Sequence, residues 1–157
     1  MSDKSSANAN FSPAARRKAR HYGMQALYQW QMTKNPLNEI EAQFHADYDL
    51  SKVDTEYFHE LVHQVPGNLS EIETAFGAFL QDRSMDELDP IELSLLRLGS
   101  YELLKRLDIP YRVAINESVA LAKKFGAAES HKYINAVLDK LAQSVRAAEV
   151  RAFSKKA

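Results

Sequence analysis

Cysteine is absent from this 157-residue chain, so neither a disulfide nor a thiolate metal site can form. A reducing compartment is the simplest environment for such a composition. No apolar run approaches the roughly 20 residues that span a bilayer. The N-terminal stretch MSDKSSANANFSP lacks the apolar segment of a signal peptide. We therefore expect a soluble, cytoplasmic protein with no membrane partner.

Glycine and proline are scarce, with five of each, and most of them fall between segments of helical periodicity. The chain contains no G-x-G-x-x-G or G-x-x-x-x-G-K-[ST] phosphate loop and no G-x-S-x-G nucleophile elbow. It also lacks the alternating Val, Ile and Thr pattern and the Asn-Gly turns of a β-sheet. These absences predict an all-α protein that is not an enzyme and needs no cofactor.

Apolar spacing predicts about seven helices that pack as two helical subdomains around a core. The helix from Pro90 carries leucines nearly all round, with Asp89 as its cap and Glu92 three residues on, so we expect it to be central and buried. The predicted organisation is a disordered extension, one helical domain in two halves, and a basic flexible tail: residues 1–12, 13–147 (halves 13–83 and 84–147) and 148–157.

The net charge is −1, but the charges are unevenly distributed along the chain. Lys and Arg counted against Asp and Glu give +5 over residues 1–35, −12 over 36–92 and +6 over 93–157. This asymmetry indicates a polyanion bound to one surface and a basic partner bound to another. Solvated helix faces are the alternative explanation.

Four cations open the first predicted helix, which runs from about Ala14 to Gln31: Arg16, Arg17, Lys18 and Arg20. Cations in the first turn of a helix interact unfavourably with the helix dipole, and each costs about 0.3–1 kcal/mol of stability. Bound phosphates would make the interaction at this helix end favourable. The cluster therefore favours nucleic-acid binding over unused surface charge. Met24 and Tyr28 fall outside the apolar arc of this helix, so we expect them to be exposed and to anchor a partner.

A second helix is predicted to begin in the stretch ESHKYIN, with Ser130 as its cap. His131 and Lys132 occupy its first turn, and Tyr133 lies beside them. Positive charge, a helix N-terminus and an aromatic ring suit single-stranded nucleic acid, because the charge follows the backbone and the ring stacks on a base. The alternative places Tyr133 at the edge of the core.

The stretch HELVH matches the H-E-x-x-H zinc motif, in which His59 and His63 would bind the metal and Glu60 would act as a base. The two histidines share a face that points away from the apolar side of their helix and toward water. Glu87 is a conceivable third ligand without further support. Surface histidines explain the motif more simply, so we assign no metal ligand, and a zinc metallohydrolase stays an alternative function.

Three stretches together resemble the NusB family of bacterial transcription antitermination factors: ARRKARHYGMQALYQWQ, ELSLLRLGSYELLKR and VAINESVALAKKFGAAESHKYINAVLDKLA. The resemblance spans about residues 13–147. It implies an all-α fold of two helical subdomains, binding to the boxA element of ribosomal RNA leader transcripts, and a heterodimer with NusE, a small-subunit ribosomal protein. That pair joins the elongating RNA polymerase complex and suppresses termination without catalysis. It also implies a homodimer in the absence of NusE.

Position by position, the resemblance assigns RNA contact to the four cations of the first helix and to Glu129, Ser130, His131, Lys132 and Tyr133. Tyr28 and Glu92 match positions associated with the NusE interface. Relatives often carry Asp where this chain has Glu129, and Asn-Gly where it has Asn135-Ala136.

Two further interpretations stay open. One is a protein-only helical interaction module that uses Met24 and Tyr28 and binds no RNA. The other starts from the NusB-like domain that begins certain ribosomal RNA cytosine methyltransferases, which continue into a Gly-rich cofactor domain. Since this chain has no such domain, we expect the freestanding factor.

Overall fold

The structure, a computed structural model, describes residues 12–156. Within that range it contains eight α-helices, one short 3₁₀ turn and no strand, which confirms the all-α prediction and comes close to the expected seven helices. No helix of this range is both long and apolar enough to cross a membrane. The chain forms two compact units, residues 1–67 and 68–157, and each is described by itself. Apart from Ser12, the extension predicted to be disordered lies outside the described residues.

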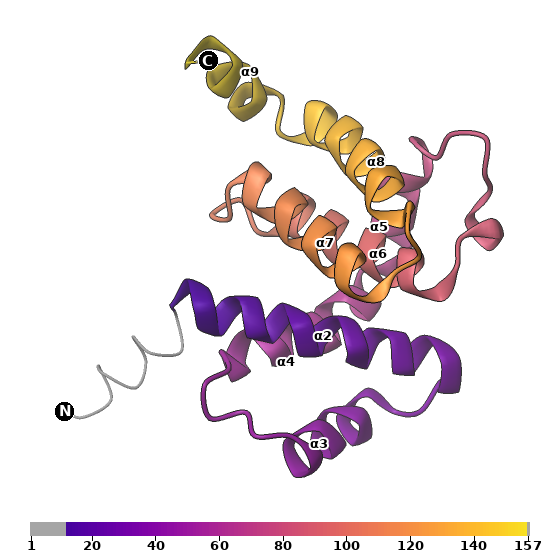
Figure 1. Ribbon diagram of the computed structural model, residues 1–157, viewed down its shortest axis with the longest axis vertical. Helices are drawn as coiled ribbons and strands as arrows, with labels where there is room; N and C mark the ends of the chain where they lie inside the picture. The colour runs from indigo at the N-terminus through magenta and orange to yellow at the C-terminus, as the bar shows by residue number, and fades with distance from the viewer. Residues whose placement is uncertain (1–11, 157) are drawn as a thin grey trace. The chain divides into compact units, whose positions relative to one another are not determined.

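Unit 1 is built from three helices: α2 (Pro13–Thr33), α3 (Leu37–Asp47) and α4 (Thr55–Gly67). Both α3 and α4 pack on α2, and they also pack on each other (Figure 1). Leu27, Phe44 and Phe58 are among the buried core side chains. A Cβ at Gly23 would lie 3.0 Å from a methyl carbon of Leu61, so α2 and α4 approach each other closely there.

Helix α4 begins with a side-chain cap. Asp54 caps it, because its Oδ1 accepts a hydrogen bond from the Tyr57 N–H at 3.0 Å. The Asp54 N–H in turn donates to the Ala15 carbonyl oxygen at 3.1 Å. The cap of α4 is thus tied to the first turn of α2, where the predicted basic cluster lies.

Unit 2 contains α5 (Leu69–Gly77), a 3₁₀ turn η1 (Met85–Glu87), α6 (Pro90–Lys105), α7 (Tyr111–Phe125), α8 (Ser130–Val145) and α9 (Ala147–Lys156). Helix α6 is central, since α5, α7 and α8 all pack on it and every residue from Glu92 to Leu103 is buried. Figure 1 shows α7 and α8 side by side. The predicted capping box is present: the Glu92 N–H donates to Asp89 Oδ1 at 2.8 Å, and the Asp89 N–H donates to Glu92 Oε1 at 3.2 Å.

Gly99 marks the closest packing around α6. A Cβ at this position would lie 2.7 Å from Leu138 Cδ1 on α8 and 2.8 Å from Ser118 Oγ on α7. Real Cβ atoms essentially never approach other heavy atoms within 3.0 Å. A larger residue at this position would therefore force the side chains of Leu138 and Ser118 to shift.

The boundary between the two units falls after Gly67, not between residues 83 and 84 as the sequence suggested. The stretch 78–89 resembles a linker because it holds only the short turn η1. Helix α5, which precedes it, packs on α6 and α8 and therefore belongs to unit 2. Sequence periodicity identifies such a helix but not the helices against which it packs.

The C-terminal tail forms helix α9, so the prediction of a flexible tail from residue 148 is wrong. Arg146 is buried and donates hydrogen bonds to carbonyl oxygens at the end of α6 and in the following loop, including those of Leu103 at 2.9 Å and Ile109 at 3.0 Å. Glu149 pairs with Arg146 at 2.7 Å and accepts the Tyr111 N–H at 2.8 Å. These hydrogen bonds pair backbone groups at the end of α6 and the start of α7 that would otherwise lack partners. They thereby hold α9 in place.

Candidate nucleic-acid interface

The first candidate surface is the start of α2. Ser12 caps this helix, since its Oγ accepts the Ala15 N–H at 3.1 Å, and Pro13 takes the first helical position. The first turn holds no acidic residue, so no carboxylate of that turn offsets the positive end of the helix dipole. The Ala15 and Arg16 N–H groups already donate to Ser12, so a bound anion would meet the basic side chains and the positive end of the dipole.

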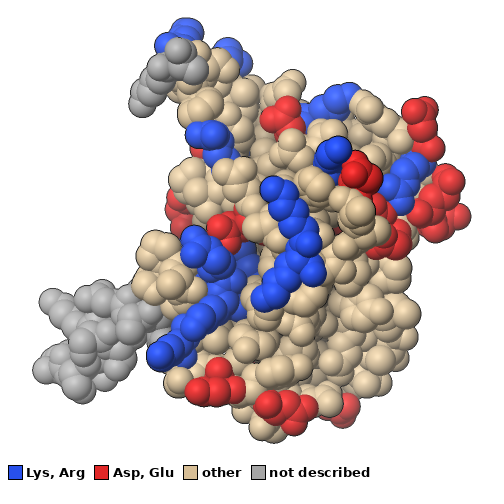
Figure 2. Space-filling view, in the orientation of Figure 1, with Lys and Arg blue, Asp and Glu red and all other residues tan. Residues whose placement is uncertain are grey.

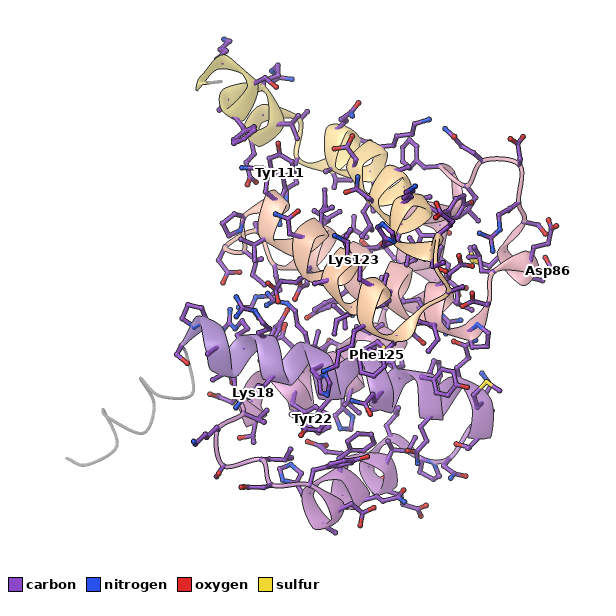
Figure 3. All side chains as sticks on the ribbon, viewed as in Figure 1. Lys18, Tyr22, Asp86, Tyr111, Lys123 and Phe125 are labelled. Carbon is purple, nitrogen blue, oxygen red and sulfur yellow. The ribbon has the colours of Figure 1, made fainter. Side chains whose placement is uncertain are left out.

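The four predicted cations divide into an exposed pair and a packed pair. Arg17 and Lys18 form the exposed pair. Figure 2 shows basic side chains over the first turns of α2, and Figure 3 labels Lys18 there. Two of the four predicted cations are therefore exposed to solvent.

Arg16 and Arg20 form the packed pair. The Arg16 Nε lies 3.5 Å from Asp54 Oδ2, and its guanidinium lies 4.6 Å from the ring centroid of Tyr57. Arg20 is buried, with its guanidinium 5.6 Å from the centroid of the same ring. These contacts stabilise the packing of α4 on α2. The predicted RNA contact by all four cations thus has less support from the structure at Arg20, which is buried, and at Arg16, which packs on α4.

The second candidate surface is the start of α8 in unit 2. Ser130 was expected to cap this helix, but Glu129 occupies the cap position and Ser130 is the first helical residue. The Ser130 hydroxyl instead donates to Glu92 Oε2 at 3.1 Å. A buried carboxylate on another helix thus takes the hydroxyl that would otherwise bond to the backbone of α8.

Three polar residues surround this helix start. His131 is half-buried, while Lys132 and Glu129 are exposed and pair at 2.9 Å. Ion pairs this exposed contribute only about 0–1 kcal/mol. A phosphate could therefore replace the Glu129 carboxylate as the partner of Lys132 at little cost.

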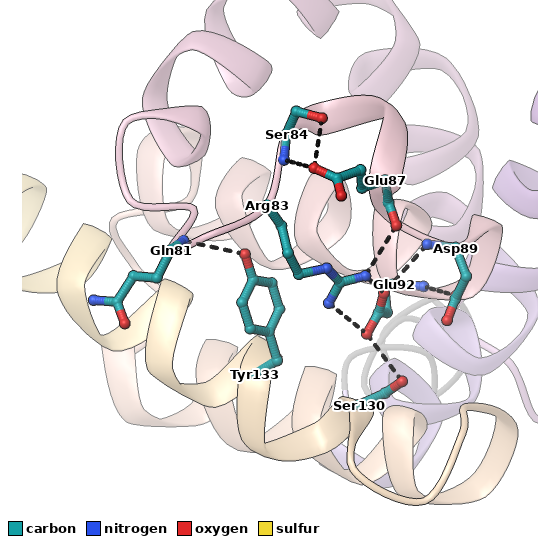
Figure 4. Close-up of polar contacts among 8 residues, drawn as sticks. All are labelled: Gln81, Arg83, Ser84, Glu87, Asp89, Glu92, Ser130 and Tyr133. Carbon is teal, nitrogen blue, oxygen red and sulfur yellow. Dashed lines mark hydrogen bonds and ion pairs between the residues drawn. The ribbon is translucent and has the colours of Figure 1, made fainter.

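Tyr133 is half-buried and already has neighbours (Figure 4). Its hydroxyl oxygen accepts the Gln81 N–H at 3.3 Å, and the Arg83 guanidinium lies 4.6 Å from its ring centroid. The ring is therefore neither a core residue nor an open stacking surface. It forms a stacked pair with an arginine from the 78–89 loop.

Glu92 holds this arginine. The two terminal nitrogens of Arg83 donate to the Glu92 carboxylate at 2.5 and 3.3 Å (Figure 4). Burial tends to raise the pKa of Glu92, but the hydrogen bonds from Arg83, the Asp89 N–H and Ser130 outweigh it, so the pKa lies below the usual 4.5. The same hydrogen bond raises the pKa of Arg83. A charged Glu92 thus joins the 78–89 loop, α6 and α8.

The three predicted partner-binding residues differ in how exposed they are. Met24 is 1% exposed, so the expectation that it lies on an exposed face is wrong. Because α3 and α4 both pack on α2, more of its circumference is covered than a single apolar arc indicates. Glu92 is 4% exposed, and its burial does not fit a direct contact with a partner. Tyr28 is half-exposed and stays a candidate.

Sequence reasoning missed two sets of basic side chains in unit 2. Lys123 and Lys124 are exposed in the last turn of α7, the helix that leads into α8 (Figure 3). The dipeptide was visible in the motif AKKFGAAESHKY, although lysines at a helix C-terminus also have a purely structural explanation. The sequence gives no indication that Arg83 belongs to this site, because its partner Tyr133 is far away along the chain.

The HELVH histidines share one face of α4, as predicted. The Glu41 carboxylate of α3 contacts both: His63 Nε2 lies 2.7 Å from Oε1 and His59 Nδ1 lies 2.8 Å from Oε2. Glu87, considered as a third ligand, accepts hydrogen bonds from the N–H and hydroxyl of Ser84 instead. Glu41 had no sequence signal, because only tertiary packing brings α3 beside α4.

Comparison with known sequences gives consistent findings. Residues 17–143 match the NusB family model. The transcription antitermination protein NusB of Saccharophagus degradans is 57% identical over 141 residues, which cover 90% of this chain and 94% of that protein. The protein of the same name from Teredinibacter turnerae is 55% identical over 139 residues, or 88% of this chain and 95% of that protein. Both names describe a transcription factor and not an enzyme, in agreement with the expectation from sequence.

Comparison with solved structures gives the same result. T. maritima NusB matches with a TM-score of 0.70 and 29% sequence identity, over 82% of this chain and 90% of that chain. The similarity therefore extends to the fold as well as to the sequence.

Proposed function

Because this chain belongs to the NusB family, we propose that it is a transcription antitermination adaptor that joins a leader RNA to a protein partner. It binds the boxA-type single-stranded leader RNA of ribosomal RNA operons and pairs with NusE, the small-subunit ribosomal protein. The pair then joins elongating RNA polymerase in the cytoplasm and suppresses termination, which supports ribosomal RNA synthesis. The observation that carries the RNA part is the presence of exposed cations at two helix starts, α2 and α8.

Phosphates are bound by side-chain charge and helix N-termini together. Arg17 and Lys18 supply the charge at α2, and Lys132 supplies it at α8, with Lys123 in the turn before α8. Each contacted phosphate of a single strand contributes about −0.7 to the slope of log affinity against log salt concentration. About four contacts therefore give a slope of roughly −3.

Base recognition is assigned to Tyr133 and its stacked arginine. Glu92 positions Arg83, and Arg83 lies over the ring, so the pair is preformed without nucleic acid. A base stacks on this pair through the half-buried ring or through the guanidinium plane. In this proposal Glu92 is a positioning residue and makes no direct contact with RNA or protein.

NusE docking is assigned to the half-exposed Tyr28 and to exposed carboxylates of the acidic segment within unit 1, such as Glu39, Asp47 and Glu56. NusE is itself an RNA-binding protein, and a basic partner suits an acidic surface. A second copy of this chain would use the Tyr28 surface when NusE is absent. The proposed interface therefore predicts that NusE competes with self-association.

The salt dependence of RNA binding tests the proposal. A labelled boxA-like RNA is titrated by fluorescence anisotropy at several salt concentrations, with the double variant Arg17→Ala/Lys18→Ala beside the unchanged chain. The variant should bind with a slope about 1.4 less steep, because two phosphate contacts are gone. The control is Lys140→Ala/Arg151→Ala, which removes the same charge from exposed positions elsewhere on α8 and α9. Equal slopes for both double variants would refute the assignment to α2.

A second titration separates the adaptor from a protein-only module. Addition of NusE should tighten RNA binding by the unchanged chain, and Tyr28→Ala should reduce that gain while RNA binding without NusE stays the same. Binding of NusE with no RNA affinity at any salt concentration would support the protein-only module instead.

A further inference from the structure

Glu41, His59 and His63 form a compact three-residue cluster in unit 1. Glu41 comes from α3, and the two histidines lie one turn apart on α4. The histidine rings have centroids 4.3 Å apart, and the Glu41 carboxylate reaches one nitrogen of each. One potential ligand atom from each of the three residues lies within 4.8 Å of the other two.

The two helices that carry the cluster are firmly placed. On α3, Ile40 and Phe44 flank Glu41 and are buried. On α4, Phe58 and Val62 precede His59 and His63 and are also buried. Because these neighbours are fixed in the core of unit 1, the cluster is held on two rigid elements and not on a loop.

His59 is the most exposed member of the cluster. The side chain of His59 is 61% exposed, whereas those of His63 and Glu41 are 27% and 16% exposed. An ion can therefore enter from solvent beside His59, and water can complete its coordination from the same side. Small shifts of the three side chains, which are hydrogen-bonded to one another here, bring their ligand atoms to coordination distances.

Each ring nitrogen that faces the carboxylate is a donor or an acceptor according to the tautomer of its imidazole. In the tautomers that hold the proton on the opposite ring nitrogen, two imidazole lone pairs and one carboxylate oxygen point into the same small volume. Two histidines and one carboxylate form a ligand set that suits Zn²⁺, which takes four tetrahedral N or O ligands at about 2.0–2.2 Å. An oxygen-preferring ion such as Mg²⁺ is poorly served by two nitrogens.

We propose that Glu41, His59 and His63 form a binding site for a borderline divalent transition-metal ion, with Zn²⁺ as the best-matched occupant. The bound ion takes the place of the two histidine–carboxylate hydrogen bonds and links α3 to α4, with a water molecule as the fourth ligand. The site is structural: it stabilises unit 1 and catalyses no reaction. It is separate from the RNA-binding residues assigned above, so either proposal can fail without the other.

The test uses the full-length chain after treatment with a chelator that is then removed by dialysis. Zn²⁺ is titrated in competition with a chromophoric chelator, and thermal unfolding is recorded with and without the ion. We expect one Zn²⁺ per chain and a higher unfolding temperature. At a free Zn²⁺ concentration 100 times the Kd, the ratio of folded to unfolded protein should rise about 100-fold. Mg²⁺ at the same concentration should have no effect.

Three variants locate the ion. Glu41→Gln and His59→Gln should each weaken Zn²⁺ binding at least tenfold, and His59→Gln alters only a mostly exposed side chain, so it should leave the core intact. His45→Gln removes an exposed histidine of α3 that is outside the cluster and should bind as the unchanged chain does. No stoichiometric binding by the unchanged chain would overturn the proposal. So would equal Zn²⁺ affinity in His59→Gln and His45→Gln.

Discussion

Replacement of Glu92 by alanine should destabilise the protein far more than replacement of an exposed carboxylate. Glu92 is 4% exposed and accepts four hydrogen bonds, from both terminal nitrogens of Arg83, from the Asp89 N–H and from Ser130. Loss of the α6 capping box costs about 1 kcal/mol. The Ser130 hydroxyl, left buried without its acceptor, costs about 1 kcal/mol more.

The ion pair with Arg83 adds to this loss. Removal of one partner from a fully buried pair costs about 3–5 kcal/mol. The side chain of Arg83 is 29% exposed, so water can solvate part of its charge after the change, and about 1 kcal/mol is the appropriate share. The total is about 3 kcal/mol, which at about 2–4 °C per kcal/mol lowers the melting temperature by roughly 6–12 °C.

Urea denaturation followed by far-UV circular dichroism measures this loss. The matched control is Glu87→Ala, which removes an exposed carboxylate of the 78–89 loop. That carboxylate caps only the short turn η1. It should cost no more than about 1 kcal/mol. If the urea midpoints of the two variants coincide, Glu92 does not have the central role that its hydrogen bonds indicate.

Three further predictions concern unit 2. Gly99→Ala should destabilise the protein by about 1–3 kcal/mol, because the new Cβ would lie 2.7 Å from Leu138; an unchanged urea midpoint would show that α8 can move aside. The pKa of Glu92 is lowered, so its charge stabilises the fold above the unfolded-state pKa of about 4.5, and this contribution is lost as the pH falls through the lower folded-state pKa. The stability gap between Glu92→Gln and the unchanged chain should therefore shrink below pH 4.5, and a gap that stays constant in denaturation curves down to pH 3 would contradict this. Tyr133→Ala should lose about 1–3 kcal/mol of RNA binding in an anisotropy titration, whereas Tyr133→Phe keeps the ring and should retain it; equal losses would exclude stacking.

Features that depend on neighbours in sequence could be predicted well. The starts of α4 and α6 rest on Asp54 and on the Asp89–Glu92 capping box, whose hydrogen bonds join residues three apart. The burial of α6 followed from leucines on every side of one helix. In each case a single short stretch contains all the groups that decide the outcome.

Features that depend on distant packing could not be predicted. Ser130 was expected to cap its own helix, but its hydroxyl bonds to Glu92, 38 residues away. Arg146 lies 43 residues from the Leu103 carbonyl that helps to hold α9. Helical periodicity assigns one buried face to each helix, so it also failed at Met24, on a helix with two neighbours in unit 1. The exposed Arg17 and Lys18 were identified correctly because they are far from any apolar face.

The anchoring of α9 has a practical consequence for engineered versions of this protein. Deletion of the last dozen residues would strip Arg146 from four carbonyl oxygens, those of Glu102, Leu103, Arg106 and Ile109. Such a truncation removes hydrogen bonds that stabilise unit 2, so it does more than shorten a flexible tail. Loss of RNA binding after C-terminal trimming would therefore report on folding, and a purification tag at that end needs a spacer long enough to leave α9 undisturbed.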